Sequence, residues 1–255
     1  MSIVDHLACS PGTSGLSFER ALEVFAWIGF RNMELFSRPG TPSAPDLDGD
    51  PAAYRTRAER HGMSVSSFHL PYIGADMDET FDAAVRAARF GEALGAEVAL
   101  FNADTRPIMI EALPRYLDAV EDLDIAIAVQ NHPGRALETG EDYREVFAGV
   151  GNDPRLKGVL EVGSFHHYGW SWRQGYDLLE GRIALVHIKD MVGQQSVPFG
   201  TGEVDIPGLI EHLSAVGYRG KFVLEMSVVD KENTIPYTRD AFRYMIDRCG
   251  QYYAD

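Results

Sequence analysis

The chain has 255 residues, of which 45% are hydrophobic, and its 38 acidic and 23 basic side chains give a formal net charge of -15. This acidity argues against a nucleic-acid partner or an anionic membrane surface, because phosphate groups are bound by a basic face. No segment approaches membrane-spanning length and the first residues lack a signal-type apolar run, so we expect a soluble, cytoplasmic protein. Cys9 and Cys249 lie far apart in the sequence, which favours a reduced pair but leaves a bridge open.

Short apolar runs of β type alternate with longer segments of helical periodicity along the whole chain. The predicted strands span 3–8, 32–36, 64–70, 97–101, 125–130, 156–162, 183–190 and 222–225. The predicted helices span 17–28, 52–61, 78–94, 109–123, 141–150, 172–179, 205–216 and 238–249. Glycines such as Gly29, Gly62 and Gly95 end several of these helices, and the segment 38–51, rich in Pro, Gly, Ser and Asp, is expected to be a loop.

This alternation predicts about eight strand–helix units in one domain over residues 1–255, without a linker-like break. Strands that alternate with helices favour a parallel sheet with crossover helices, and eight units in roughly 250 residues is the size of a (β/α)8 TIM barrel. A doubly wound open sheet is the competing fold. No glycine-rich phosphate-binding fingerprint follows the first strand, which continues into Ala8-Cys9-Ser10-Pro11-Gly12-Thr13, so the barrel is preferred.

Polar side chains stand at the predicted ends of the apolar strands, where a barrel holds its chemistry. They are Glu34, His69, Asn102, Gln130, His132, Glu161, His187, Lys189 and Glu225. Carboxylate and amide oxygens together with imidazole favour a divalent cation such as Mn²⁺, Mg²⁺, Co²⁺ or Zn²⁺. The candidate metal ligands are Gln130, Glu161, His187 and Glu225, one from each of four successive strands that lie about 4.8 Å apart.

Each of these residues also has a structural interpretation. His187 fits a buried, hydrogen-bonded histidine, and the neutral amide of Gln130 is a weak cation ligand that also suits a bond to loop backbone. Lys189 and Asp190 fit a loop ion pair, although a lysine at this end of a barrel also suits an anionic substrate or a proton transfer. Glu225 follows three apolar residues, where a purely structural glutamate is costly.

Several stretches of sequence together resemble the xylose isomerase-like TIM barrels. They are VHIKD at 186–190, GTGEVDIPGLIEHL at 200–213, FVLEMS at 222–227 and QNHPG at 130–134, with GFRNMELF at 29–36 and GMSVSSFHLP at 62–71 fitting the second and third strands of that family. The resemblance covers essentially the whole chain, and the order and spacing of the motifs carry it. This family includes sugar phosphate isomerases and epimerases, inosose dehydratases, hydroxypyruvate isomerase and relatives of endonuclease IV.

The resemblance implies a metal set of a Glu after strand five, an Asp after strand six, a His after strand seven and a Glu after strand eight. His187 and Glu225 match this set, whereas Gln130 stands where Glu is usual and Glu161 where Asp is usual. Ser164 takes a position at which many members have a His. In the epimerases, the glutamates after strands five and eight resemble a pair of acid/base groups. Gln130 stands at the first of these positions and is neutral, which disfavours two-base epimerisation. One-base isomerisation, dehydration or β-elimination remain open.

The sequence therefore predicts a metal-dependent isomerase, epimerase or lyase that abstracts a proton next to a carbonyl of a sugar, keto-sugar or inositol-type substrate. Glu225 is the predicted base, and His69, Lys189 or His132 would be the second group. The predicted substrate-binding residues are Glu34, Asn102, His132, His166 and Trp172, the last two from an aromatic loop that would stack on a sugar or merely pack. The alternative is a metal-free or non-catalytic barrel that binds a sugar or serves as a partner subunit. The surface is compatible with a homo-oligomer.

Overall fold

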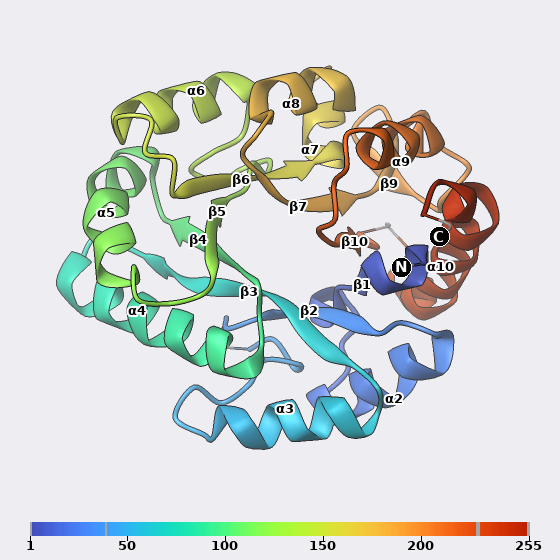
Figure 1. Cartoon of the computed structure of the whole chain (residues 1–255), viewed down its shortest axis with the longest axis horizontal. Coiled ribbons are helices and arrows are strands. Elements are labelled where there is room, and N and C mark those ends of the chain that lie inside the picture. Colours follow the sequence, from blue (N-terminus) through green and yellow to red (C-terminus); the bar gives the residue numbers. More distant parts are fainter. Residues whose placement is uncertain (1, 39, 228–229, 254–255) are drawn as a thin grey trace.

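The computed structural model describes residues 2–38, 40–227 and 230–253, and these form a closed barrel of eight parallel strands (Figure 1). The barrel strands are β1 Leu7–Cys9, β2 Asn32–Phe36, β3 Ser64–Ile73, β4 Val98–Ala103, β5 Ala126–Val129, β6 Leu156–Glu161, β7 Ile183–Ile188 and β10 Phe222–Leu224. Each strand lies beside its predecessor in the ring, and β10 closes the barrel against β1. The predicted (β/α)8 barrel is confirmed.

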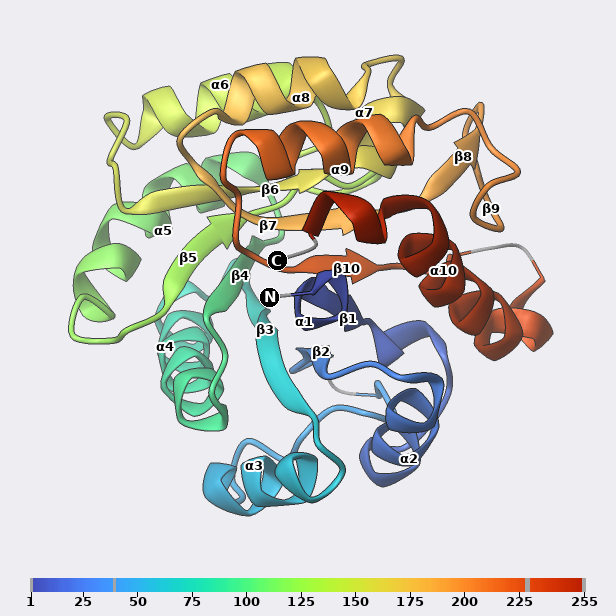
Figure 2. The same cartoon turned by 45° about the vertical axis from the view of Figure 1, so that its right-hand side comes forward.

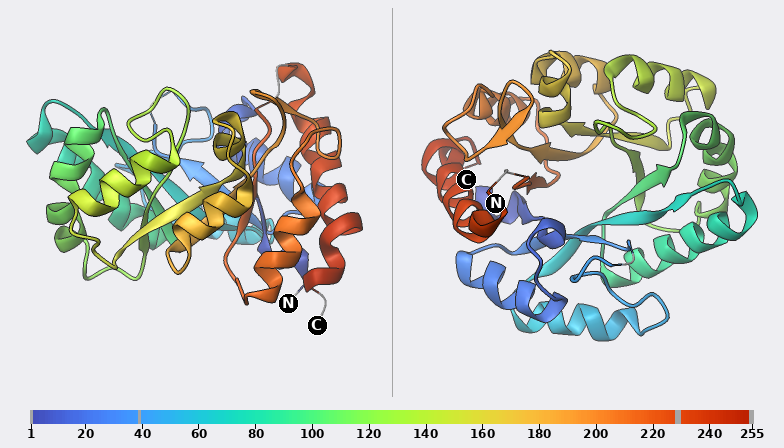
Figure 3. Two further views of the ribbon diagram at one scale, coloured as in Figure 1. Left: turned by 90° about the horizontal axis from the view of Figure 1, so that it is seen from above. Right: turned by 180° about the vertical axis from the view of Figure 1, so that it is seen from behind.

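Helices surround the barrel on its outer side, as Figures 1 and 3 show. They are α1 Ile3–His6, α2 Phe18–Ile28, α3 Pro51–Arg60, α4 Met77–Leu94, α5 Arg106–Ala119, α6 Gly140–Gly149, α7 Val162–His167, α8 Trp172–Leu179, α9 Ile206–Ala215 and α10 Thr234–Cys249, with short 3-10 turns at Pro11–Thr13, Lys231–Asn233 and Gly250–Tyr253. Within the described ranges, no helix combines the length and the apolar character that crossing a membrane requires.

The core has two layers, because strands of a barrel are buried on both faces. The inner layer fills the barrel with small and branched side chains, namely Ala8, Val98, Leu100, Ala128, Val159, Leu185 and Val223. The outer layer lies between strands and helices and holds large side chains such as Phe68, Phe101 and Tyr116. Full burial of one such apolar side chain stabilises the folded state by about 1.5–3 kcal/mol. Packing on both faces of the strands therefore holds the strand ends in place.

Most helices start where the sequence provides an N-terminal cap. The side chains of Ser17, Asp50, Asp76, Thr105, Thr139, Ser171 and Asp205 each accept a backbone N–H of the first helical turn. Such caps are worth about 1 kcal/mol each. The C-terminal residues Gly29 and Gly95 take positive φ angles of 120° and 100°, which a residue with a Cβ adopts only under strain. These signals explain why most predicted helices are confirmed within a few residues.

Three local features differ from the sequence-based expectation. Ile3–His6 form helix α1 and only Leu7–Cys9 form the first strand, because the Asp5 carboxylate accepts the N–H of Ser2 at 2.9 Å and closes a helical turn. Helix α7 is absent from the predicted elements, since the sixth strand passes into it directly at Glu161. The hairpin of β8 Asp190–Val192 and β9 Gln195–Val197 is likewise absent from them.

Both cysteines are buried and free, which agrees with the predicted reduced pair. They lie on different elements, with Cys9 at the end of β1 and Cys249 at the end of α10. Figure 2 shows α1 and β1 next to α10, where the first and last elements of the chain meet. Burial raises the pKa of the Cys249 thiol to about 12, so this thiol stays protonated and unreactive at neutral pH.

Tyr143 of α6 anchors β5 and β6, the two strands that lead to Gln130 and Glu161. Its buried hydroxyl accepts the N–H of Asn131 at 3.1 Å and lies 2.8 Å from the Val159 carbonyl and 3.1 Å from the Val129 carbonyl, to one of which it donates. It therefore ties the end of β5 to β6. Buried polar groups of this kind are costly to leave unpaired.

We expect Tyr143→Phe to lower the free energy of unfolding by about 1–3 kcal/mol, because it leaves the buried Asn131 N–H without its partner. The matched control is Tyr116→Phe, whose buried hydroxyl only donates to the Ala84 carbonyl at 3.1 Å, so its loss is expected to be smaller. Urea denaturation followed by circular dichroism measures both variants. Equal losses in the two variants would contradict the proposed anchoring.

Candidate active site

The predicted strand-end residues form a compact cluster at one end of the barrel. Glu34 lies in β2, Glu161 ends β6 and His187 lies near the end of β7, and all three side chains are fully buried. Lys189 follows β7 and is also buried, whereas Glu225 follows β10 with 13% of its side chain exposed. The strand register brings them together, because Glu161 pairs directly with His187 across β6 and β7.

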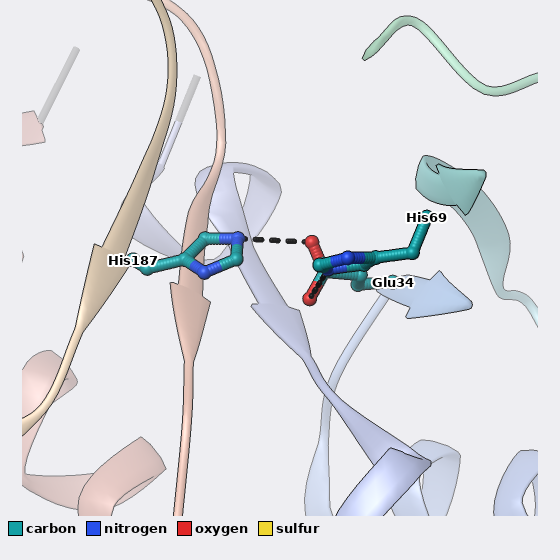
Figure 4. Close-up of side chains that lie close together, drawn as sticks. All are labelled: Glu34, His69 and His187. Atoms are coloured by element: carbon teal, nitrogen blue, oxygen red, sulfur yellow. Dashed lines mark hydrogen bonds and ion pairs between the residues drawn. The ribbon is translucent and has the colours of Figure 1, made fainter. Parts of the chain in front are cut away.

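The imidazole of His187 faces carboxylates on two sides. Its Nε2 lies 2.9 Å from Glu34 Oε2, and its Nδ1 lies 3.3 Å from Glu161 Oε2 and 3.6 Å from Glu225 Oε1. Figure 4 shows Glu34 between His187 and His69, with the Glu34–His187 hydrogen bond drawn as a dashed line. Because Glu34 fixes one nitrogen, the other is directed at Glu161 and Glu225.

Glu34 is held by several partners and lies out of contact with solvent. The hydroxyls of Ser67 and Ser10 donate to it at 3.0 Å and 3.4 Å. His69 Nε2 lies 3.2 Å from Glu34 Oε1, in an orientation that does not meet hydrogen-bond geometry. These contacts make Glu34 a support for His187. The predicted substrate-binding role does not fit this position, because a fully buried carboxylate does not reach a ligand in the barrel mouth.

Lys189 bridges the two carboxylates on the other side of His187. Its Nζ lies 2.5 Å from Glu225 Oε2 and 3.2 Å from Glu161 Oε2. Glu161 also accepts the backbone N–H of Gly163 at 3.1 Å. The predicted ion pair between Lys189 and Asp190 is therefore replaced by these contacts. Asp190 accepts the backbone N–H groups of Met191, Gly200 and Gly202 and thereby shapes the loop after β7.

The ionisation of the cluster follows from burial and from these opposite charges. Burial opposes ionisation of Glu34, but the neighbouring His187 and His69 lower the pKa of this carboxyl below its usual range. Burial likewise opposes the charge on Glu161, and Lys189 and His187 lower its pKa. Burial by itself lowers the pKa of His187 and of Lys189, but the facing carboxylates outweigh this effect and raise the pKa of both groups. The cluster is a network of paired charges.

Gln130 follows β5 and completes the arrangement beside the His187 Nδ1. Its Nε2 donates to Glu161 Oε2 at 3.0 Å and lies 3.0 Å from His187 Nδ1. Rotation of the amide by 180° would place its carbonyl oxygen at the same point, where it would accept from a protonated Nδ1 or face a cation. Thus all four predicted metal ligands converge on one small region.

The donor set fits a divalent cation. One donor atom each from Glu161, His187 and Glu225 lie within 4.8 Å of one another, and so do atoms from Glu34, His69 and His187. Two carboxylates and one imidazole suit Mn²⁺, Co²⁺, Zn²⁺ or Mg²⁺. The group with Glu161 and Glu225 is the better candidate, because it faces Gln130 and contains the partly exposed Glu225. In the other group, Glu34 already accepts the hydrogen bond of His187.

A cavity of about 260 Å³ opens at this end of the barrel. Its lining includes six of the predicted residues, namely His69, Asn102, Gln130, His132, Lys189 and Glu225. Glu34, Glu161 and His187 lie behind this lining. The Asn102 amide donates to the Leu70 and Leu100 carbonyls at 2.9 Å and 3.1 Å, so it holds the adjacent strands while its surface contributes to the cavity.

The structure places His166 and Trp172 outside this cavity. His166 lies on α7, with its Nε2 3.2 Å from Glu203 Oε2. Trp172 begins α8, and its ring centroid lies 5.7 Å from that of the His212 ring. The predicted substrate-binding role therefore does not fit these two side chains, because α7 and α8 turn the aromatic segment toward the outer helices.

The cavity also contains residues outside the predicted set. Arg38 comes from the loop after β2, Tyr72 from the end of β3 and Arg135 from the loop after β5. Loop residues follow no periodic pattern, so sequence periodicity does not assign their side chains to the mouth. The sequence holds one signal for Arg38, since it is a basic residue that stands shortly after a predicted strand in a strongly acidic chain.

A closed parallel barrel whose strand ends gather carboxylates, an imidazole and a lysine around a cavity defines an enzyme-type (β/α)8 barrel. The sequence pattern of one family matches residues 22–248. The chain accordingly belongs to the xylose isomerase-like TIM barrel family.

Solved structures with less than 20% sequence identity share the fold of this chain. The IolI protein with a bound zinc atom superposes with a TM-score of 0.78 at 17% identity, covering 100% of both chains. An L-ribulose 3-epimerase superposes with a TM-score of 0.76 at 16% identity, covering 96% of this chain and 95% of that one. A putative L-ribulose-5-phosphate 3-epimerase of Escherichia coli K12 is 43% identical over 53 residues, which is 18% of each chain.

We expect Glu34→Ala to lower the free energy of unfolding by about 3–5 kcal/mol, because it leaves the buried Nε2 of His187 without its carboxylate partner. Glu34→Gln keeps an oxygen for the hydrogen bond and should lose less. Urea unfolding measures both variants. The control is Glu23→Ala, which removes an exposed partner of Arg20 and should change stability by less than about 1 kcal/mol. A Glu34→Ala loss no larger than this control would refute the supporting role of Glu34.

Proposed function

We propose that this protein is an isomerase, epimerase or lyase that acts on a sugar, keto-sugar or inositol-type compound by abstracting a proton next to a carbonyl. Membership of the xylose isomerase-like family supports this proposal. So do the names of the similar proteins, which include an L-ribulose 3-epimerase. The reaction begins with Glu225 as the base.

The position of Glu225 carries this proposal. Among the described residues that line the cavity, Glu225 is the only one with a carboxylate. The Lys189 ammonium lies 2.5 Å from Glu225 Oε2 and orients this carboxylate, and a positioned carboxylate can accept a proton as a general base. Glu225 takes the proton from the carbon beside the carbonyl, the C–H electron pair becomes the carbon–carbon double bond, and the carbonyl oxygen takes up the negative charge. His69 and Lys189, which also line the cavity, are placed to donate to that oxygen.

The fate of the resulting enediolate separates the reaction types. Isomerisation delivers the proton to the former carbonyl carbon while the proton of the neighbouring hydroxyl passes to the former carbonyl oxygen, whereas elimination expels a β-hydroxyl group that leaves with a proton as water. Epimerisation at one carbon requires a second group on the opposite face. Gln130 is a neutral amide that does not act as a base, so a one-base isomerisation or elimination is the preferred reaction.

A divalent cation is part of the proposal. Glu161, His187 and Glu225 would hold it, with the Gln130 carbonyl oxygen as a fourth donor, and the zinc in the similar IolI structure supports such a site. When bound, the cation would supply Lewis-acid polarisation of the substrate's carbonyl and hydroxyl oxygens. Lys189 and Glu34 would keep the protein ligands oriented through their contacts with Glu161 and His187.

A second candidate is a barrel that binds a sugar without turnover. One observation favours it, since the Lys189 ammonium and the Gln130 amide already compensate Glu161 and Glu225. The cluster is therefore electrostatically satisfied by its own side chains. Hydrogen exchange on a substrate and the metal content of the protein separate this candidate from the enzyme.

Proton abstraction predicts that the protein, supplied with Mn²⁺, exchanges the hydrogen beside the carbonyl of a substrate sugar for deuterium in ²H₂O. Proton NMR on a panel of pentuloses, hexuloses and inososes would show this exchange. We expect Glu225→Gln to slow it by about 10²- to 10⁴-fold, since the amide is no base. The matched control Glu211→Gln changes an exposed carboxylate on α9 and should leave the rate unchanged. No exchange with any member of the panel would favour binding without turnover.

The metal part of the proposal predicts about one equivalent of Mn, Co, Zn or Mg per chain, measured by elemental mass spectrometry on purified protein. Glu225→Ala and His187→Ala should each lose the metal, because each removes one of the proposed ligands. Circular dichroism checks that both variants are folded. Absence of metal in the wild type, even after incubation with Mn²⁺, would reject the metal-dependent mechanism.

A further inference from the structure

The cavity has a charge opposite to that of the chain. Its lining contains three basic side chains, Arg38, Arg135 and Lys189, and one acidic side chain, Glu225, among the residues that the structure describes. The whole chain, by contrast, has 38 acidic residues against 23 basic ones. A cleft lined by one sign of charge attracts ligands of the opposite sign.

The basic groups differ in whether their charge is already compensated. Lys189 lies between Glu161 and Glu225 and is paired with both. Arg38 and Arg135 are exposed and line the cavity. Over the described ranges, neither guanidinium forms an ion pair or a side-chain hydrogen bond. Among the described residues, the charges of Arg38 and Arg135 are thus uncompensated, whereas that of Lys189 is compensated by Glu161 and Glu225.

Both arginines line the cavity near the ends of the neighbouring strands β2 and β3. Arg38 follows β2, and the Arg135 guanidinium reaches from the loop after β5 to within 5.7 Å of the Tyr72 ring centroid, at the end of β3. β3 is the direct neighbour of β2 in the barrel. The π face of the Tyr72 ring attracts the positively charged guanidinium and so favours this position of Arg135. Glu225 follows β10, which is two strands away from β2 and three away from β3 in the ring.

We infer that Arg38 and Arg135 form a subsite for the anionic group of the substrate, a phosphate or a carboxylate, away from the reacting carbon at Glu225. Guanidinium groups bind both anions in a bidentate manner. The Glu225 carboxylate repels such a group from its own end, so the substrate has one orientation in the cavity. The substrate class is therefore an acidic or phosphorylated polyhydroxy carbonyl compound. This inference rests on the proposed function for the identity of the reacting end only.

Binding measurements on sugar pairs that differ in the anionic group test the subsite. Isothermal titration calorimetry of the full-length protein at fixed ionic strength would compare D-fructose with D-fructose 6-phosphate, and D-glucose with D-glucuronate. We expect the anionic member of at least one pair to bind about tenfold or more tightly than the neutral one, as for charge-assisted hydrogen bonds. The two pairs show whether phosphate or carboxylate is preferred. Inorganic phosphate serves as a probe that contains no sugar.

Variants show whether the preference comes from the arginines. Arg38→Ala and Arg135→Ala should each reduce the preference about tenfold, with the neutral sugars unaffected. Arg86→Ala, which removes an exposed arginine of α4, is the matched control and should keep the preference. Equal binding of neutral and anionic sugars, or a preference that survives in both variants, would overturn the inference. Equal binding of inorganic phosphate to the wild type and to the double variant would overturn it as well.

These outcomes are separable from those of the proposed function, because they concern binding and not turnover. Glu225→Gln should retain the arginine-dependent preference. An arginine-dependent preference without deuterium exchange would sustain the subsite and reject the proton abstraction. Deuterium exchange that proceeds equally well with neutral sugars and in both arginine variants would sustain the proton abstraction and reject the subsite.

Discussion

The site depends on the placement of one imidazole between carboxylates from different parts of the barrel. His187 lies at 2.9 Å from Glu34 and at 3.3 Å from Glu161, and all three side chains are fully buried. A buried carboxylate without a partner destabilises a fold by several kcal/mol. The barrel therefore has to close in a register that places Glu34 of β2 and Glu161 of β6 beside His187 of β7. For this reason the geometry of the site and the stability of the fold are set by the same contacts.

The charges of the mouth are organised by depth. At the deep end, Lys189 and His187 compensate Glu161, Glu225 and Glu34, so that the charges of this region are paired among themselves. At the opening, Arg38 and Arg135 are exposed. Buried groups are held in one geometry by their partners, whereas exposed groups keep the freedom to adjust to a ligand. Such a division suits a site in which the reacting carbon needs a fixed base and the remainder of the ligand needs orientation.

The sequence predicted the barrel and most strand-end residues, because the polar side chains stand directly after apolar strands and helix caps mark the boundaries. The bounds of β2 and α8 agree with prediction to the residue. It did not predict that Glu34 supports His187, because β2 and β7 are not neighbours in the ring and their contact crosses the barrel interior. Nor did it place Arg135, since a loop after a Pro-Gly turn has no periodicity that fixes side-chain direction.

The neutral side chain of Gln130 is consistent with the charges around it. A glutamate at this position would bring another negative charge within about 3 Å of Glu161, in a cluster whose three carboxylates already face two cationic partners. Like charges at this distance in a buried site do not both remain ionised. Gln130 avoids that conflict when no ion is bound, and it retains an oxygen for a cation. Because a cation at the His187 Nδ1 would displace any proton there, binding of the ion and release of the proton would be coupled. A carboxylate at position 130 would strengthen the attraction for the ion, whereas the amide lets the cluster persist without it.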